Sequence, residues 1–138
     1  MTIDPSVKIR RVRENSDLPL PRYQTPGSAG ADLLADIQGE WVLQPLERRL
    51  IPTGLAIELP RGFEGQIRPR SGLALKSGVT CLNTPGTVDA DYRGEVQVLL
   101  INLSHEPVRI SRGDRIAQLI VAPVSRASFI EVETLTES

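Results

Sequence analysis

The stretch EVQVLLIN, residues Glu95–Asn102, is the most apolar run between turn-forming residues and predicts a β-strand. On both sides of it, further short apolar or alternating runs lie between clusters of Pro, Gly, Asn and Asp. They are Val7–Val12, Ala31–Ala35, Trp41–Leu43, Arg49–Ile51, Leu55–Leu59, Gly65–Arg68, Val79–Leu82, Val108–Ile110, Ile116–Val121 and Ser128–Val132. Strands with one apolar face must stack or close to bury it, so this pattern predicts an all-β antiparallel sandwich or barrel.

The composition supports that prediction and leaves room for little helix. Eleven Gly and eleven Pro in 138 residues argue against long helices. One short helix is expected near Gly72–Lys76, where good helix formers precede the breaker Ser77-Gly78. Pro60-Arg61-Gly62 predicts a hairpin connection. No domain boundary or repeat interrupts the pattern, so residues 1–138 are expected to form a single domain.

Charge and cysteine content exclude several classes of protein. Sixteen basic and seventeen acidic residues are mixed along the chain and give a net charge of −1, which predicts no nucleic-acid partner. Cys81 is the only cysteine, so a disulfide framework is excluded and a reducing compartment is expected. Neither a secretion signal nor a membrane span is predicted, because no apolar run is long enough. We therefore expect a cytoplasmic protein without a membrane partner.

Two polar segments are candidates for phosphate and water chemistry. Arg70 and Ser71 precede the short helix, whose first backbone N–H groups favour an anion; alternatively, Ser71 is only a helix cap and Arg70 a surface residue. Between Gly86 and Gly94, a carboxylate such as Asp89 could act as general base, or the stretch could be an Asp-rich turn. The spacing alone leaves these alternatives open.

Four isolated polar residues carry weaker signals. Asp32 lies inside an apolar run. It could be an edge charge that discourages aggregation, or a group that holds water around a cation. Gln118 is a lone polar residue in a strand, where an outward position is typical. Cys81 is expected to be a buried small side chain, and His105 a surface residue of a polar loop.

Taken in order, four segments resemble the first four motifs of the trimeric deoxyuridine triphosphatase (dUTPase) family. They are AGADLLA, PRSGLALKSGV, NTPGTVDADYRGEVQVLLIN and RGDRIAQLIVAPV. The resemblance implies a distorted jelly-roll or β-barrel subunit of the β-clip type, assembled as a homotrimer with shared active sites. It also implies Mg²⁺-dependent hydrolysis of dUTP to dUMP and pyrophosphate, which keeps uracil out of DNA and supplies dUMP for dTMP synthesis.

The resemblance also implies roles for individual residues. Asp89 matches the aspartate that activates the water attacking the α-phosphorus, and Asp32 one that holds water in the outer shell of Mg²⁺. The remaining matches are substrate-binding positions. They are Arg70, Ser71, Gly72 and Gln118 near the phosphates, Asn83, Thr87 and Val88 for uracil, Tyr92 against the deoxyribose, and Gln97.

The family's fifth motif, a glycine-rich stretch with an arginine and a phenylalanine, is expected after a segment like FIEVETLTES, where the printed sequence ends at Ser138. Two alternatives to dUTP hydrolysis therefore remain. One is a relative of dCTP deaminase, which shares the fold, although GTVDADYRGE resembles the hydrolase motif. The other is a non-catalytic dUTP-binding or regulatory trimer that lacks the closing lid.

Overall fold

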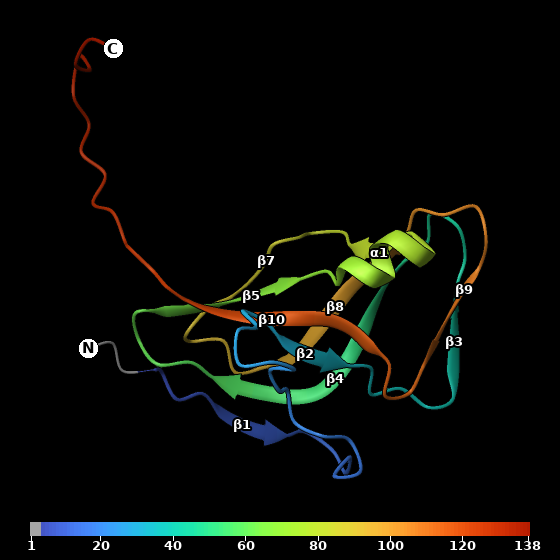
Figure 1. The fold of residues 1–138 in the computed structure, drawn as a ribbon. Coiled ribbons are helices and arrows are strands. Elements are labelled where there is room, and N and C mark those ends of the chain that lie inside the picture. Colours follow the sequence, from blue (N-terminus) through green and yellow to red (C-terminus); the bar gives the residue numbers. More distant parts are fainter. Residues whose placement is uncertain (1–3) are drawn as a thin grey trace.

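The computed structural model describes residues 4–138, which form ten strands and one helix (Figure 1). In chain order, the elements are β1 (Lys8–Arg11), β2 (Ala31–Leu34), β3 (Glu40–Leu43), β4 (Arg48–Glu58), β5 (Phe63–Arg68), α1 (Ser71–Ser77), β6 (Val79–Cys81), β7 (Gly86–Val88), β8 (Glu95–Asn102), β9 (Val108–Ser111) and β10 (Arg115–Pro123). The expected all-β class and the short helix are confirmed.

All strand pairs are antiparallel and fall into three sheets. The strand orders are β1-β4-β8-β6, β2-β10-β5-β7 and β3-β9. The apolar core draws residues from all three sheets, among them Ile51, Val98, Ile116, Leu33 and Ile110, each at most 2% exposed. Burial alternates along β8, so Val96, Val98 and Leu100 fill the core while Gln97 faces outward.

Strand β4 joins two predicted strands into one. The sequence Pro52-Thr53-Gly54 is typical of a turn, yet the structure accommodates it as an irregularity in the pairing of β4 with β8. Gly54 has φ +74°, and a Cβ built there would lie 2.0 Å from Asn15 Nδ2. Only glycine fits this close approach of backbone and side chain.

Three expectations from local sequence need correction. Pro60–Gly62 is a turn, but it connects β4 of one sheet to β5 of another, so the predicted hairpin is wrong. Ser128–Val132 forms no strand, because its alternating residues find no partner within the described chain. Gly86–Val88 is not among the strands expected from the sequence, yet it forms strand β7.

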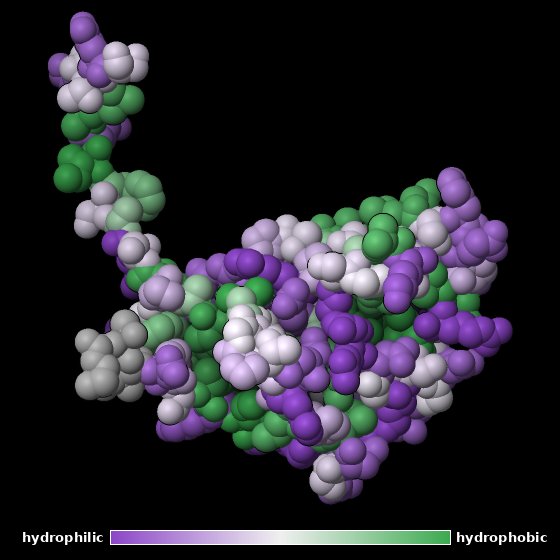
Figure 2. Space-filling view, in the orientation of Figure 1, coloured by the Kyte–Doolittle hydropathy of each residue, from purple (hydrophilic) through white to green (hydrophobic). Residues whose placement is uncertain are grey.

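The C-terminal residues extend away from the body of the molecule (Figure 1). Figure 2 shows apolar side chains along this tail, and Phe129 and Ile130 are 96% and 80% exposed. Within residues 4–138, no helix has the length and apolar character needed to cross a membrane.

Candidate functional site

The first group of predicted site residues lies where β2 pairs with β10. Strand pairing places Gln118 opposite both Asp32 of β2 and Arg68 of β5. The Gln118 amide donates from Nε2 to the carbonyl of Pro69 at 3.0 Å. A Cβ at Gly30 would lie 2.1 Å from Gln118 Oε1, so this glycine leaves the space that the amide occupies. The expectation that Gln118 simply faces outward is therefore too simple.

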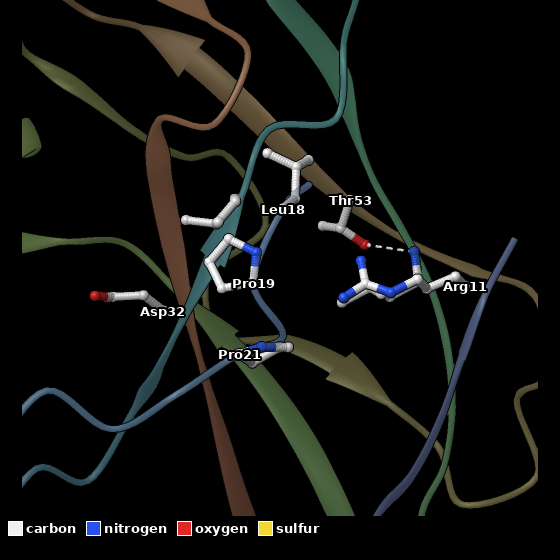
Figure 3. A pocket seen from close by; sticks show the side chains of 8 residues that line it. Arg11, Leu18, Pro19, Pro21, Asp32 and Thr53 are labelled. Atoms are coloured by element: carbon white, nitrogen blue, oxygen red, sulfur yellow. Dashed lines mark hydrogen bonds between the residues drawn. The ribbon is translucent and has the colours of Figure 1, made fainter. Parts of the chain in front are cut away.

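Asp32 carries a buried carboxylate between two arginines. Its Oδ1 lies 3.3 Å from Arg70 Nε, and its Oδ2 lies 3.8 Å from Arg115 Nε. Oδ2 is buried and accepts no hydrogen bond from any described residue. In Figure 3 the Asp32 side chain points away from Thr53 and Arg11, which line the opposite side of a small pocket. An unused, buried anionic acceptor is costly unless a ligand or water completes it.

The side chains around Asp32 can be compared with what binding of the predicted Mg²⁺ would require. Among residues 4–138, no set of three or more His, Cys, Asp or Glu side chains could hold a metal ion directly. The orphan oxygen of Asp32 fits the lesser role of accepting a hydrogen bond from water around an ion. A divalent ion at this position would therefore need ligands from a bound substrate.

Helix α1 begins beside this carboxylate. Arg70 occupies the N-cap position, and no side chain makes a capping hydrogen bond, so the alternative role of Ser71 as helix cap is wrong. Ser71 and Gly72 are exposed in the first turn. The Arg70 guanidinium donates to the carbonyl of Arg115 at 3.3 Å, in addition to its ion pair with Asp32. The Arg70 guanidinium is thus held at the start of the helix, where its exposed neighbours leave access from solvent.

The second group of residues surrounds β7. Thr87 lies opposite Gln66 of β5 and has an exposed side chain, whereas Val88 is buried in the core. Asn83 is exposed in the turn that precedes β7, next to Gly86, and the Thr84–Pro85 peptide bond is cis. Val88 can therefore offer a ligand only its backbone, while Asn83 can offer its amide.

Asp89 and Tyr92 occupy the turn that follows β7. The Tyr92 backbone N–H donates to the carbonyl of Asp89 at 3.1 Å, and the Tyr92 hydroxyl donates to the carbonyl of Glu95 at 2.8 Å. A Cβ at Gly94 would lie 2.6 Å from the Tyr92 hydroxyl oxygen, so only glycine lets the ring approach the chain here. The Asp89 side chain is exposed and borders an open groove that Arg61 and Arg126 also line.

One chain does not bring Asp89 to the first group of residues. Gln118 lies opposite Arg68, whereas Asp89 follows Val88, which lies opposite Gly65. The Cα atoms of Gln118 and Asp89 are separated by two strand spacings and by about four residues along the strands, which is a distance of roughly 16 Å. Gln97 lies elsewhere again, exposed on β8 of the other sheet opposite Pro52.

Other predicted residues lie where the sequence suggested, and some charged residues were overlooked. Cys81 is buried in β6, and burial raises the pKa of its thiol to about 11. His105 is exposed in the loop before β9. Arg115, the second charge facing Asp32, was overlooked although it stands inside the quoted stretch RGDRIAQ.

A separate cluster around Asp36 was also overlooked, because its members are scattered along the chain. The Asp36 carboxylate accepts hydrogen bonds from Arg13 Nε and Asn15 Nδ2, each at 2.8 Å, and from Arg112. Burial by itself would raise the pKa of Asp36, yet these hydrogen bonds and the two arginine charges hold that pKa below its usual value.

Comparison with known sequences and folds gives one consistent answer. The sequence model of the dUTPase family matches residues 16–138. A protein of Methylocella silvestris called deoxyuridine 5'-triphosphate nucleotidohydrolase is 59% identical over 94% of this chain and 82% of its own length. Proteins of the same name from Aquifex aeolicus and Caldanaerobacter subterraneus are 61% and 56% identical, over 87% and 96% of this chain and 80% and 89% of theirs.

Among solved structures, the chain resembles a dUTPase from phage phi11 of S. aureus, with a TM-score of 0.82 and 22% identity over 96% of this chain and 99% of that one. A dUTPase of Staphylococcus bacteriophage 80alpha gives a TM-score of 0.80 at 23% identity, covering 96% and 91%. These structures share the fold of strands and one short helix described above. The extent of the family match and of the identity to relatives shows that the chain belongs to the dUTPase family.

Proposed function

We propose that this protein hydrolyses dUTP to dUMP and pyrophosphate, with Mg²⁺, through attack of an Asp89-activated water on the α-phosphorus. The observation that carries the proposal is the match to relatives named for this activity, at 54–61% identity over at least 80% of their length. The exposed carboxylate of Asp89 supports its role, since a general base must reach a water molecule.

Charge stabilisation would fall to the group around α1. A nucleoside triphosphate carries about four negative charges, and hydrolysis concentrates charge on the leaving pyrophosphate. Arg70, Ser71 and Gly72 present a guanidinium, a hydroxyl and backbone N–H groups from one exposed turn, and Gln118 lies beside Pro69. A bound Mg²⁺ would neutralise phosphate charge and polarise the phosphorus. Asp32 would accept hydrogen bonds from its water shell through Oδ2.

Base and sugar selection would fall to β7 and its flanking turns. Uracil presents an acceptor–donor–acceptor edge, which backbone groups of Thr87 and Val88 and the amide of Asn83 can match. Cytosine would leave some of these polar groups unpaired. Thymine differs by a methyl group, so its exclusion is steric. A ribose 2′-hydroxyl would collide with a Tyr92 ring packed against the sugar.

A homotrimer with shared sites explains the separation within one chain. If a neighbouring subunit supplies Asp89, it can act with Arg70 on one substrate, although the Cα atoms of Asp89 and Gln118 are roughly 16 Å apart in a single chain. The outer face of the β4–β8 pair supports contact between copies, because Leu50 is 54% exposed there and lies opposite Leu99. Gln97 extends from this face, so its proposed substrate contact would also involve a neighbouring subunit.

The central test is release of pyrophosphate from dUTP, dCTP, dTTP and UTP with Mg²⁺, and again with EDTA in excess. We expect turnover of dUTP alone and its loss with EDTA. Comparable turnover of all four nucleotides contradicts the proposal. Ammonia released from dCTP would favour the deaminase alternative, and tight binding of dUTP without turnover would favour the regulatory one. A cytoplasmic location stays a prediction from the sequence.

The role of Asp89 is tested by Asp89→Asn, with Asp91→Asn as the matched control in the same exposed loop. We expect Asp89→Asn to lower kcat by two or more orders of magnitude, the usual contribution of a general base, with dUTP affinity largely kept. Asp91→Asn should retain kcat within about twofold. Near-normal turnover of Asp89→Asn would exclude this residue as the base.

Sharing of sites is tested by mixing two inactive variants. Arg70→Ala and Asp89→Asn subunits, co-expressed with different tags, should form mixed trimers in which some sites combine an intact Asp89 with an intact Arg70. Random assembly predicts recovery of about one quarter of the wild-type rate. Sites contained in one chain would give no recovery. Light scattering should accompany this test, since the chain mass is 15.1 kDa and a trimer has three times that mass.

A further inference from the structure

The turn that carries Asp89 and Tyr92 is anchored at its end by one residue, Glu95. The main-chain carbonyl of Glu95 accepts the hydroxyl hydrogen bond of Tyr92 at 2.8 Å. Glu95 also begins β8 and lies opposite Ala56 of β4, next to the pairing irregularity at residues 52–56. The position of the Tyr92 ring therefore depends on where the chain is held at Glu95.

Arg13 holds Glu95 from a distant part of the chain. Its Nη1 and Nη2 donate to Glu95 Oε1 and Oε2, both at 2.8 Å. Such a paired contact fixes orientation as well as distance, because the planar guanidinium matches the carboxylate. The Glu95 side chain is only 16% exposed, so the pair is shielded from solvent on that side.

The guanidinium of Arg13 is itself fixed by Asp36. Arg13 Nε donates to Asp36 Oδ2 at 2.8 Å, and the Asp36 side chain is 2% exposed. Asn15 and Arg112 also donate to this carboxylate. A chain of charged hydrogen bonds thus runs from the buried Asp36 through Arg13 to Glu95, and its far end holds the hydroxyl of Tyr92.

We propose that Arg13 is a positioning residue that sets the place of the Tyr92 ring through Glu95, and thereby sets the preference for deoxyribonucleotides over ribonucleotides. The inference rests on the proposed function, in which Tyr92 packs against the sugar. A steric barrier to one hydroxyl group requires a rigidly held ring, since a misplacement of about 1 Å can change a reaction rate by about 10²-fold. Tyr92 is 40% exposed, so packing around its own ring supplies only part of that rigidity.

The test is the ratio of kcat/KM for dUTP to that for UTP in Arg13→Gln. We expect the ratio to fall about tenfold, through faster use of UTP, while kcat for dUTP changes less than threefold. Tyr92→Phe keeps the ring and removes the hydrogen bond to Glu95, so it should lower the same ratio. The double variant Arg13→Gln/Tyr92→Phe should lower the kcat/KM ratio little further, because both substitutions break the same chain of hydrogen bonds.

Arg112→Gln separates positioning from general stability. Arg112 contacts Asp36 and Asp17 but has no hydrogen bond to Glu95 among the described residues, so its loss should lower Tm and leave the ratio unchanged. The proposal is overturned if Arg13→Gln keeps the wild-type ratio, or if Arg112→Gln lowers it equally. If Arg13→Gln does not fold, an unchanged ratio in Tyr92→Phe overturns it instead.

A binding measurement distinguishes failure of this inference from failure of the proposed function. The ratio of Kd values for UMP and dUMP, measured by calorimetry, reports sugar selection without catalysis. A wild-type protein that selects dUMP but releases no pyrophosphate would contradict the proposed reaction and still allow the comparison with Arg13→Gln. Binding of neither nucleotide, together with no release of pyrophosphate from dUTP, would overturn both.

Discussion

Asp32 and Asp36 lie four residues apart in or just after β2, and both carboxylates are buried, yet their surroundings differ. The side chains are 11% and 2% exposed. Both oxygens of Asp36 accept hydrogen bonds, from Arg13, Asn15 and Arg112. Asp32 Oδ2 accepts none from the described residues. A buried carboxylate with both oxygens in hydrogen bonds stabilises the fold, whereas a buried carboxylate with one oxygen that accepts no hydrogen bond is suited to bind a ligand.

The largest expected effect is loss of stability in Asp36→Asn. Asparagine removes the charge that faces two arginines and replaces one acceptor oxygen with an NH2 donor, and breaking a buried ion pair in this way typically costs about 3–5 kcal/mol. Urea unfolding monitored by Trp41 fluorescence should measure it. Asp17→Asn is the control, because Asp17 contacts Arg112 alone and its side chain is 66% exposed, so a change below about 0.5 kcal/mol is expected. A loss below 1 kcal/mol for Asp36→Asn would remove the contrast with Asp32.

Gly54→Ala should damage the Asp36 cluster without changing its charges. The added methyl would lie 2.0 Å from Asn15 Nδ2 and 2.1 Å from Asp36 Oδ2, at φ +74°. We expect a loss of about 2–4 kcal/mol from strain and displaced hydrogen bonds. Gly39→Ala, at φ +65° with no atom within 4 Å, should lose only about 1 kcal/mol. Equal losses in the two variants would mean that the crowding at Gly54 is unimportant.

Asp32→Asn should affect function more than stability. We expect unfolding free energy to change by only about 1 kcal/mol, because Arg70 and Arg115 are partly solvated. The Mg²⁺ concentration that gives half-maximal pyrophosphate release should rise about tenfold, as is usual when a group that orients metal-bound water is lost. A large stability loss with unchanged Mg²⁺ dependence would make Asp32 a structural residue like Asp36.

The smallest expected effect is a pH-dependent difference between wild type and Asp36→Asn. The folded protein lowers the pKa of Asp36 below its ordinary value of 3.8, so the carboxylate contributes stability above that pH. The contribution is lost as pH falls through the lower folded pKa. The difference in Tm between the two proteins should therefore be constant near neutrality and shrink below about pH 4. A difference that does not change between pH 7 and pH 3 would contradict this linkage.

Sequence and structure agree best where a residue's role depends on its neighbours in the chain. Glu95–Asn102 is expected to form a strand because it is an apolar run bounded by turn-forming residues, and β8 spans these residues. The short helix begins and ends within a residue of its expected bounds, because the helix formers and the C-cap Gly78 that follows them are local signals. Pro52-Thr53-Gly54 misleads for the opposite reason. A turn signal becomes a strand irregularity only because Asn15 and Asp36 lie against it.

Local sequence is enough to predict the all-β class, the short helix and the residues that resemble a nucleotide site, because periodicity, turn residues and ordered motifs are properties of neighbouring positions. It does not predict which buried aspartate has all its acceptors in hydrogen bonds and which keeps a free oxygen. The donors to Asp36 come from Arg13 and Arg112, 23 and 76 residues away. Hydrogen-bond satisfaction of a buried charge depends on partners that only folding brings within reach, so no local pattern around Asp32 or Asp36 could distinguish them.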